Sequence, residues 1–391
     1  MFKNFLYYVP VKIEFGQGKL NETGKYVKQY GTKALIVTTG TFFEENGLVG
    51  RLQKILQDSG VASEYFADVN PNPLATQVEN GVAFARKTGC DVFIGLGGGS
   101  AIDAAKAMAY GLGNNEPIWP CWIGQKPLGD KTMPIIAITT TSGTGSHVTP
   151  YSVITNLETK EKPGIGNDST YAKVAIVDPE LMLSVPPAIT AATGFDILAH
   201  CIEAYTSNQS TPLTDLFCEE AIRLVGQYLR KAVADGKDLE ARNALAYADT
   251  LAGCSIATAV ITLCHAMAHA VGGVCETTHG ESLAAMTPHT MRFSMSALPE
   301  KYRKIGLFLR GECTCDSCCP KKDWQPEDSV KEVEKIIKAI GMAKPLGQQG
   351  VNASDSEAIA DGTLRYMAGA VKLDPREATK ADILEILKKS L

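Results

Sequence analysis

The sequence predicts an α/β amino-terminal domain built on a parallel sheet, followed by an all-α carboxyl-terminal domain. With 391 residues, the chain is too long for one core of usual size, so two domains are expected. In the first half, short apolar runs alternate with amphipathic stretches. Beyond Pro186 and Pro187, the chain becomes rich in alanine with helical spacing and no clear strand. We therefore expect domains at residues 1–185 and 186–391.

The strands and helices of the first domain follow one another in regular alternation. VKIEF (11–15) alternates polar and apolar residues, as a half-buried strand does. The strands expected after it are KALIVTTG (33–40), SEYFADV (63–69), DVFI (91–94), PIIAI (134–138) and AKVAIVDP (172–179). The helices expected between them are GLVGRLQKILQDSG (47–60), QVENGVAFARKTG (77–89) and AIDAAKAMAYGL (101–112). This rhythm predicts a Rossmann-like sheet with helices on both faces and a ligand site beyond the carboxyl ends of its strands.

Composition narrows the range of functions. The chain is 45% hydrophobic and 21% charged, which is typical of a soluble globular protein. A net charge of -5 offers no basic surface for nucleic acid and no polybasic segment for anionic lipid. No stretch approaches the roughly 18 apolar residues of a membrane span, and the segment MFKNFLYYVPVKIEFG does not look like a signal peptide. We expect a cytoplasmic protein that binds neither nucleic acid nor membrane.

Two glycine-rich loops follow predicted strands. In GLGGGSAIDAAK (95–106), Gly98, Gly99 and Ser100 lie where the backbone can approach a diphosphate at the start of a helix. Alone, this loop is equally well explained as a tight turn. TTTSGTGS (139–146) repeats the arrangement and adds the hydroxyl groups of Thr140, Thr141 and Thr144. Two such loops at one edge of a parallel sheet predict a dinucleotide site.

Four of the six histidines lie in two short motifs. Asp196 and His200 stand four residues apart in TAATGFDILAHCIEAY (190–205), so on a helix they share one face. The run CHAMAHAVGGVCETTHGE (264–281) adds three more histidines, and Ala266 replaces the glutamate base that a zinc protease needs. An acid and three histidines suit Zn²⁺ or Fe²⁺. We expect Asp196, His200, His265 and His279 to bind a metal and His269 to carry a proton.

These motifs, together with DPELMLSVPPAITAATGFDILAHCIEAYTS (178–207), closely resemble the iron-containing (group III) alcohol dehydrogenases of the lactaldehyde reductase and 1,3-propanediol dehydrogenase type. The resemblance runs from about residue 5 to 295, and the last hundred residues match only loosely. It implies a dehydroquinate synthase-like architecture with the metal in the cleft between the two domains, and a homodimer or larger homo-oligomer. The cofactor contacts that it implies are Asn72, Gly99, Ser100, Thr140, Thr141, Lys162 and the stretch from Leu181 to Val185.

The function expected from these parts is a metal-dependent alcohol dehydrogenase that uses NAD or NADP. A divalent metal, Fe²⁺ or alternatively Zn²⁺, would polarise the oxygen of a small primary alcohol, diol or aldehyde, and hydride would move to or from the nicotinamide. A zinc-dependent glycerol or polyol dehydrogenase of the same fold is one alternative. A metallohydrolase could use the same ligands with a bound water, but it would not need two dinucleotide loops.

The residues after KALIVT bear on the choice of cofactor. Family members that prefer NAD carry an acid there, which repels a 2′-phosphate, whereas this chain has Thr39, Gly40 and Thr41. We therefore predict that NADP is accepted. The alternative is that Thr39 serves the ribose of NAD.

The eleven cysteines fall into two groups. Seven are scattered among apolar neighbours and are expected to be small buried residues of a reducing compartment: Cys90, Cys121, Cys201, Cys218, Cys254, Cys264 and Cys275. The other four, Cys313, Cys315, Cys318 and Cys319, are crowded into CTCDSCC. Zinc binding and an exposed insertion with free thiols both stay open for this cluster.

Overall fold

The computed structural model of the chain describes residues 4–312, 314 and 324–391. The expectations for the cluster of Cys313, Cys315, Cys318 and Cys319 lie outside these residues. The described chain forms two compact units. The sheet unit contains Val9–Thr141 and Ser146–Met182, and the helical unit contains Ser142–Gly145, Leu183–Leu391 and the amino-terminal residues up to Tyr8, within the described ranges. The helical unit thus includes two short segments from the first half of the chain.

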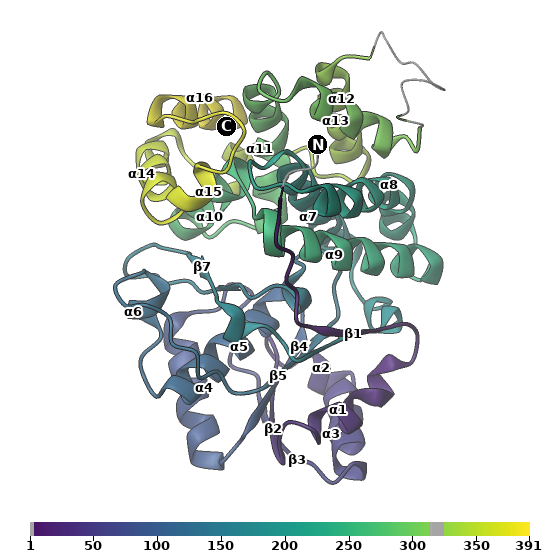
Figure 1. The fold of residues 1–391 in the computed structure, drawn as a ribbon, viewed down its shortest axis with the longest axis vertical. Coiled ribbons are helices and arrows are strands. Elements are labelled where there is room, and N and C mark those ends of the chain that lie inside the picture. The colour runs from purple at the N-terminus through teal and green to yellow at the C-terminus, as the bar shows by residue number, and fades with distance from the viewer. Residues whose placement is uncertain (1–3, 313, 315–323) are drawn as a thin grey trace. The chain divides into compact units, whose positions relative to one another are not determined.

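The sheet unit is built on six strands, and every neighbouring pair is parallel (Figure 1). The strands are β1 (Lys12–Phe15), β2 (Lys33–Val37), β3 (Ala62–Phe66), β4 (Val92–Gly97), β5 (Ile135–Thr139) and β8 (Val174–Val177), in the spatial order β1-β8-β5-β4-β2-β3. The parallel sheet expected from the alternating pattern is confirmed. Because β4, β5 and β8 are buried on both faces, their sequences are continuously apolar rather than alternating.

Helices pack against both faces of this sheet. α4 (Ala75–Thr88) and α5 (Gly99–Asn114) share an apolar cluster with Leu35 and Phe93. α1 (Thr23–Val27) and α3 (Leu48–Asp58) share a second cluster with Ile36 and Ile94, the next residues along the same two strands. Successive side chains of a strand point to opposite faces, so each strand contributes to both clusters. The short helices α2 (Phe42–Glu45) and α6 (Trp119–Trp122), and the antiparallel pair β6 (Ser152–Val153) and β7 (Gly164–Ile165), were not expected from the sequence.

The strand order fixes where a ligand can bind. β2 lies between β3 and β4, so the order of connection reverses between β2 and β4. In open parallel sheets, ligands bind beyond the carboxyl ends of the strands at such a switch point. The register pairs Gly97 of β4 with Thr139 of β5, and Thr139 with Val177 of β8, so the loops after these strands begin at the same edge.

The helical unit contains no strand among its described residues, as expected. Its helices are α7 (Pro187–Thr206), α8 (Pro212–Ala234), α9 (Leu239–Ala259), α10 (Leu263–Cys275), α11 (His279–Ser294), α12 (Pro299–Leu309), α13 (Pro326–Ala339), α14 (Ser356–Tyr366), α15 (Ala368–Val371) and α16 (Lys380–Ser390). They share one apolar core. Taken singly, none of the described helices has the length and apolar composition to cross a membrane; α9 and α10 have them only together, and the two are bent by 99°.

The seven scattered cysteines are free thiols in this structure. Six of them are buried, as expected, and Cys275 is partly exposed.

Candidate active site

Helix α7 carries the first two predicted metal ligands. Pro187 occupies its first turn, where a missing backbone N–H removes no helical hydrogen bond. Asp196 and His200 follow on one face of the helix, and Asp196 Oδ1 lies 3.5 Å from His200 Nδ1. Both side chains are almost completely buried, with 4% and 8% of their surface exposed. A carboxylate in this position needs a cationic or hydrogen-bonding partner.

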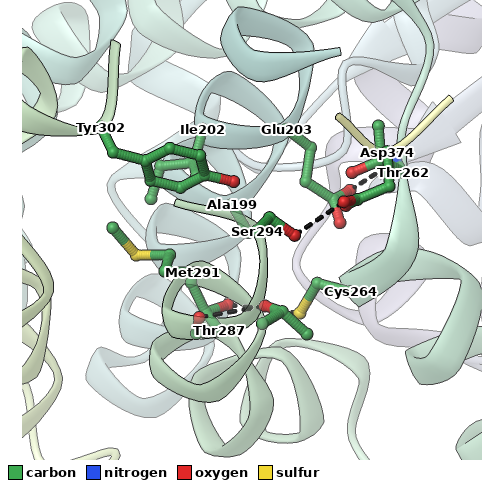
Figure 2. Close-up of a pocket in the computed structure, with 11 residues that line it drawn as sticks. Ala199, Ile202, Glu203, Thr262, Cys264, Thr287, Met291, Ser294, Tyr302 and Asp374 are labelled. Atoms are coloured by element: carbon green, nitrogen blue, oxygen red, sulfur yellow. Dashed lines mark hydrogen bonds between the residues drawn. The ribbon is translucent and has the colours of Figure 1, made fainter. Parts of the chain in front are cut away.

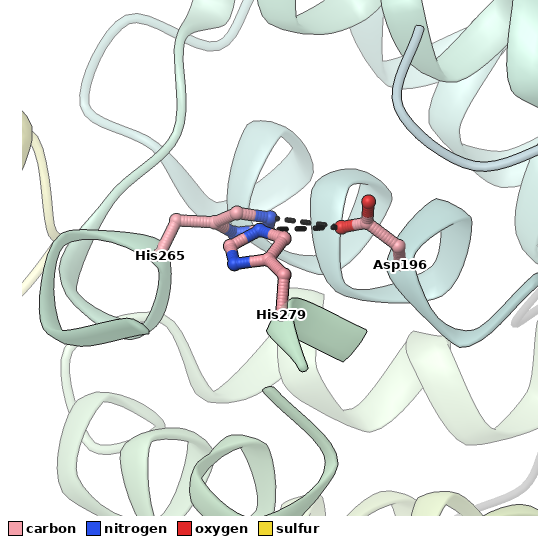
Figure 3. A group of neighbouring side chains, drawn as sticks. All are labelled: Asp196, His265 and His279. Atoms are coloured by element: carbon pink, nitrogen blue, oxygen red, sulfur yellow. Dashed lines mark hydrogen bonds and ion pairs between the residues drawn. The ribbon is translucent and has the colours of Figure 1, made fainter. Parts of the chain in front are cut away.

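Helices α10 and α11 bring two more histidines to Asp196 (Figure 3). His265 Nε2 lies 3.2 Å and His279 Nε2 lies 4.0 Å from Asp196 Oδ1. His279 is the first residue of α11, and the next residue is Gly280. A Cβ atom on Gly280 would lie 2.4 Å from the carbonyl oxygen of Ala192 in α7. Only glycine therefore allows α11 to begin this close to α7, which places His279 beside Asp196.

Three of the predicted ligands form a compact group of donor atoms. Asp196, His265 and His279 each offer one ligand atom, and these atoms all lie within 4.8 Å of one another. His200 lies beside this group rather than in it. Its ring stacks on that of His265, with the ring centroids 4.3 Å apart, and its Nδ1 lies 3.2 Å from the carbonyl oxygen of Gly143.

A glutamate that the sequence analysis missed orients His265. Glu203 is buried on α7, and its Oε2 lies 2.6 Å from His265 Nδ1. The same carboxylate accepts hydrogen bonds from the backbone N–H groups of Thr262 and His265, at 3.0 and 3.1 Å. It therefore also caps the amino terminus of α10, where the helix dipole favours a negative charge. The signal in the sequence was its spacing, since Glu203 follows His200 by three residues on the same helical face.

The charges of this group shift the pKa values of its members. Burial disfavours the charged form of His265, but Glu203 and the hydrogen bonds to both carboxylates outweigh this and raise the pKa of His265 to about 9. Burial likewise opposes ionisation of Glu203, yet the charge of His265 and its hydrogen bonds lower the pKa of Glu203. Burial lowers the pKa of His200 to about 4. In the protein without a metal, the protonated ring of His265 is therefore the cation that faces Asp196.

The donor set fits a divalent transition metal. A carboxylate oxygen and imidazole nitrogens are the ligands that Zn²⁺ and Fe²⁺ accept. A metal would replace the Nε2 proton of His265, because ligating nitrogens must be deprotonated. Glu203 would keep its hydrogen bond to Nδ1, the arrangement by which outer carboxylates orient metal-binding histidines.

His269 lies one helical turn after His265 on α10. Its ring meets that of His279 edge to face, with the centroids 5.5 Å apart, and it is 6% exposed. It is not part of the donor group. The structure therefore places His269 next to a predicted ligand.

A small buried cavity lies behind Glu203 (Figure 2). Several polar side chains contribute to its lining, and Ser294 Oγ donates to Asp374 Oδ1 at 2.7 Å. Burial raises the pKa of Asp374 to about 6. The polar residues that line the cavity are Glu203, Thr262, Cys264, Thr287, Thr290, Ser294, Tyr302 and Asp374.

The predicted dinucleotide loops meet at one edge of the sheet. Gly98 precedes the first residue of α5, so Gly99 and Ser100 form the start of that helix. The backbone N–H of Thr140 donates to the carbonyl oxygen of Gly97 at 2.9 Å, which joins the loop after β5 to the loop after β4. Thr141 is the last residue of the sheet unit before the chain enters Ser142–Gly145.

Other predicted cofactor residues of the sheet unit lie around these loops. Lys162 Nζ donates to Asn72 Oδ1 at 2.8 Å, and the hydroxyl of Ser100 donates to the carbonyl oxygen of Pro71, the neighbour of Asn72. Thr39 is half-buried and lies two residues after the end of β2. Leu181 is buried in the apolar cluster that contains α1 and α3.

Other predicted cofactor residues, Thr144 and the stretch from Leu183 to Val185, belong to the helical unit instead. The carbonyl oxygen of Val185 accepts a hydrogen bond from Arg242 Nη2 at 2.8 Å.

The sequence analysis also missed a buried charged pair on α5. Lys106 is fully buried, and its Nζ donates to the carbonyl oxygens of Ser146, Thr149 and Tyr151 at 2.7, 2.9 and 2.7 Å. Asp103 accepts hydrogen bonds from the Ser146 hydroxyl and from the backbone N–H of Val153. Burial lowers the pKa of Lys106 to about 8. Asp103 and Lys106 stand three residues apart in GGGSAIDAAK, and this spacing was the signal in the sequence that the two side chains share a helical face.

Comparison with known proteins identifies the family. Residues 10–179 match the iron-containing alcohol dehydrogenase family, and residues 190–391 match the carboxyl-terminal domain of the Fe-containing alcohol dehydrogenase family. The chain is 34% identical over 385 residues to the NAD-dependent methanol dehydrogenase of Bacillus methanolicus, which covers 98% of this chain and 99% of the relative. It is 34% identical over 395 residues to the 1,3-propanediol dehydrogenase of Klebsiella pneumoniae, over 100% and 99% of the two chains.

Solved structures agree with these matches. An archaeal halo-thermophilic alcohol dehydrogenase from a Red Sea brine pool superposes with a TM-score of 0.95 at 35% identity, over 100% of both chains. The family match extends through the final hundred residues to residue 391. The helices of that region share the core of the metal-binding helices, which constrains their sequence. The chain therefore belongs to the iron-containing alcohol dehydrogenase family and is an oxidoreductase.

Proposed function

We propose that this oxidoreductase interconverts small primary alcohols or diols and the corresponding aldehydes with NAD or NADP, and that Asp196, His200, His265 and His279 hold the divalent metal that the reaction needs. The observation that carries the proposal is the convergence of one carboxylate oxygen and two imidazole nitrogens within 4.8 Å in a chain of this family. The relatives named for methanol and 1,3-propanediol support short alcohols as substrates. A metallohydrolase is not supported, because the family is one of dehydrogenases.

Each group of residues has a separate role in this proposal. When bound, the metal supplies Lewis acidity toward the substrate oxygen and the nicotinamide supplies the hydride exchange. With the metal bound, Glu203 would keep the proton on His265 Nδ1, so that the lone pair of Nε2 is free to ligate the metal. The backbone at Gly98, Gly99 and Ser100 begins α5, whose amide groups and dipole suit a diphosphate. Thr39, Asn72, Thr140, Thr141, Thr144, Lys162, Leu181 and Val185 complete the proposed cofactor contacts.

His269 is the proposed proton carrier. It is buried one turn from His265 and its ring lies edge-on to that of His279, which puts a further imidazole beside the proposed metal site. His269→Ala should lower kcat more than it lowers metal content. An equal loss of metal would make His269 a ligand instead.

The reaction is tested by following nicotinamide absorbance. Metal-free protein is reloaded with Fe²⁺ or Zn²⁺ and offered short alcohols, diols and aldehydes, each with NAD and with NADP. We expect turnover that depends on one equivalent of metal. The metal that gives the higher turnover distinguishes an iron enzyme from a zinc polyol dehydrogenase of the same fold. Absence of turnover with every metal, cofactor and substrate in the panel contradicts the proposal.

We propose further that NADP is accepted. In support, the loop after β2 carries Thr39, Gly40 and Thr41 and no acid that would repel a 2′-phosphate. The Thr38 hydroxyl of this loop bonds to the Gly40 carbonyl and to Tyr65. Comparing kcat/KM for the two cofactors tests this point. A large excess of activity with NAD refutes it.

The quaternary structure and location complete the proposal. We propose a homodimer or larger homo-oligomer in the cytoplasm. In support, the ring of Tyr7 packs against Phe217, and the flanking Leu6 and Leu216 are 81% and 63% exposed, which leaves an apolar surface on the helical unit. Light scattering that gives a monomer mass at micromolar concentration contradicts the oligomer.

A further inference from the structure

Asp249 is a buried carboxylate on α9 that no part of the proposed chemistry uses. Only 1% of its surface is exposed. Its Oδ1 accepts a hydrogen bond from the backbone N–H of Gly145 at 2.8 Å, and the backbone N–H of Gly143 donates to the same carboxyl group. Asp249 therefore binds the segment Ser142–Gly145 at two points.

The segment is pressed onto α9 at this place. Gly145 has a φ of +60°, and a Cβ atom there would lie 2.5 Å from the Cα of Gly253 on α9. The backbone thus approaches the helix as closely as two glycines allow. The segment also packs on α7, since a Cβ atom on Gly143 would lie 2.6 Å from Thr193 Cβ. The hydrogen bonds to Asp249 fix the backbone N–H groups of Gly143 and Gly145 toward α9.

The same segment contacts a proposed metal ligand. His200 Nδ1 lies 3.2 Å from the carbonyl oxygen of Gly143. A carbonyl oxygen can only accept a hydrogen bond, so Nδ1 carries the proton and donates it. The unprotonated nitrogen of a neutral ring is then Nε2, and this is the nitrogen available to a metal.

We propose that Asp249 is a positioning residue for the metal site, which fixes the Ser142–Gly145 segment so that the Gly143 carbonyl sets the tautomer and orientation of His200. This inference rests on the proposed function. Glu203 does for His265 by direct contact what Asp249 does for His200 through a loop. The same loop follows Thr140 and Thr141 without interruption, so Asp249 also anchors the end of the proposed cofactor loop.

The test is the dissociation constant for Zn²⁺ at pH 7.5, measured by competition with a chromophoric chelator and without substrate or cofactor. Asp249→Ala removes both acceptors and should weaken Zn²⁺ binding about 10- to 100-fold, as loss of an outer partner of a ligand does. Asp249→Asn keeps one acceptor oxygen, so it can retain at least one of the two hydrogen bonds, and it should lose clearly less Zn²⁺ affinity than Asp249→Ala. If Asp249→Ala does not fold, Asp249→Ser, whose hydroxyl ends short of the loop, takes its place with the same expectation.

Ser255→Ala is the matched control. Ser255 is fully buried on the same helix, and its hydroxyl bonds to carbonyl oxygens of Leu251 and Thr214, away from the loop. We expect this variant to lose thermal stability in EDTA but to bind Zn²⁺ like the wild type.

The outcomes separate the inference from the function on which it rests. Unchanged Zn²⁺ affinity in Asp249→Ala overturns the inference. A loss in Asp249→Asn as large as in Asp249→Ala also overturns it, because the carboxylate would then act through its charge and not by positioning. A wild-type protein that binds no divalent metal contradicts the proposed function itself.

Discussion

Each of the two units buries a cluster of charged side chains, and the clusters differ in how their charges are compensated. In the sheet unit, the Lys106 ammonium faces three backbone carbonyl oxygens and the hydroxyl of Ser146. In the helical unit, Asp196 faces the ring nitrogens of His200, His265 and His279. The first cluster surrounds a cation with fixed acceptors. The second brings a carboxylate oxygen and one nitrogen each of His265 and His279 within 4.8 Å of one another, where they can ligate a cation.

This difference distinguishes a buried charge that stabilises the fold from a buried charge that can bind a ligand. A buried charge is tolerated only where hydrogen bonds or an opposite charge replace water. Lys106 obtains this compensation from the chain alone, and it ties the segment after β5 to α5. Asp196 obtains it from a proton on His265, whose pKa is raised to about 9, and a divalent cation can replace that proton. The four predictions below test this contrast, from the largest expected effect to the smallest.

Asp196→Asn should have the largest effect on activity. It removes a ligand oxygen and the negative charge at the centre of the donor group, so kcat/KM should fall by at least about 100-fold, more than the loss of an outer partner causes. Metal content after gel filtration should fall with it. The matched variant is Asp103→Asn, a buried carboxylate in the other cluster. Asp103→Asn should lower the melting temperature but leave the metal content unchanged. Loss of metal in Asp103→Asn, with metal retained in Asp196→Asn, would contradict our distinction between the two clusters.

Lys106→Met should have the largest effect on stability. It leaves three carbonyl oxygens and Asp103 without their buried partner, so the free energy of unfolding should fall by about 3 kcal/mol or more. Denaturant unfolding measures the loss, and metal content should stay at the wild-type value. The control is Lys54→Met, an ion pair on the surface of α3 with 67% of the lysine side chain exposed, which should change stability by less than about 0.5 kcal/mol. Equal losses in the two variants would mean that the Lys106 hydrogen bonds contribute little.

Glu203→Gln should weaken the metal site without removing a ligand. Both carboxylate oxygens of Glu203 accept hydrogen bonds from N–H groups. The amide NH₂ of glutamine would therefore face another donor, and a hydrogen bond would be lost. We expect the affinity for Zn²⁺ to fall about 10- to 100-fold. Glu219→Gln is the control, since Glu219 bonds to Tyr205 on α7 and does not contact a proposed ligand. An unchanged affinity in Glu203→Gln would show that His265 keeps its orientation without this carboxylate.

His147 should give the smallest effect, a loss of stability in mild acid. Burial, together with the charge of Lys106, lowers the pKa of His147 to about 3. The folded protein therefore keeps the ring neutral while the unfolded chain protonates it below about pH 6.5. Stability is present above that pH and is lost as the pH falls toward 3, by about 1 kcal/mol between pH 7 and 5.5. Denaturant unfolding at both pH values should show a smaller loss in His147→Asn, and an equal loss would exclude His147 as its source.

Much of the fold followed from local patterns. The apolar runs at 33–40, 91–94 and 134–138 became β2, β4 and β5, and the amphipathic runs between strands became α3, α4 and α5. The short elements β6, β7 and α6 were missed, because two to four residues are too few to show a periodicity. Spacing on one helix also predicted that Asp196 and His200 share a face.

The sequence by itself determined which residues could ligate a metal, where the glycine-rich loops follow strands, and that a parallel sheet precedes a helical unit. These properties depend on residue type and on spacing within one element. Only the tertiary structure decided that Glu203 orients His265, that Asp249 holds the loop at Gly143, and that Lys106 ends among carbonyl oxygens. The partners in these contacts are 40 to 104 residues apart, and no periodicity links residues across such a distance. They meet because the packing of the apolar core brings their helices and loops together.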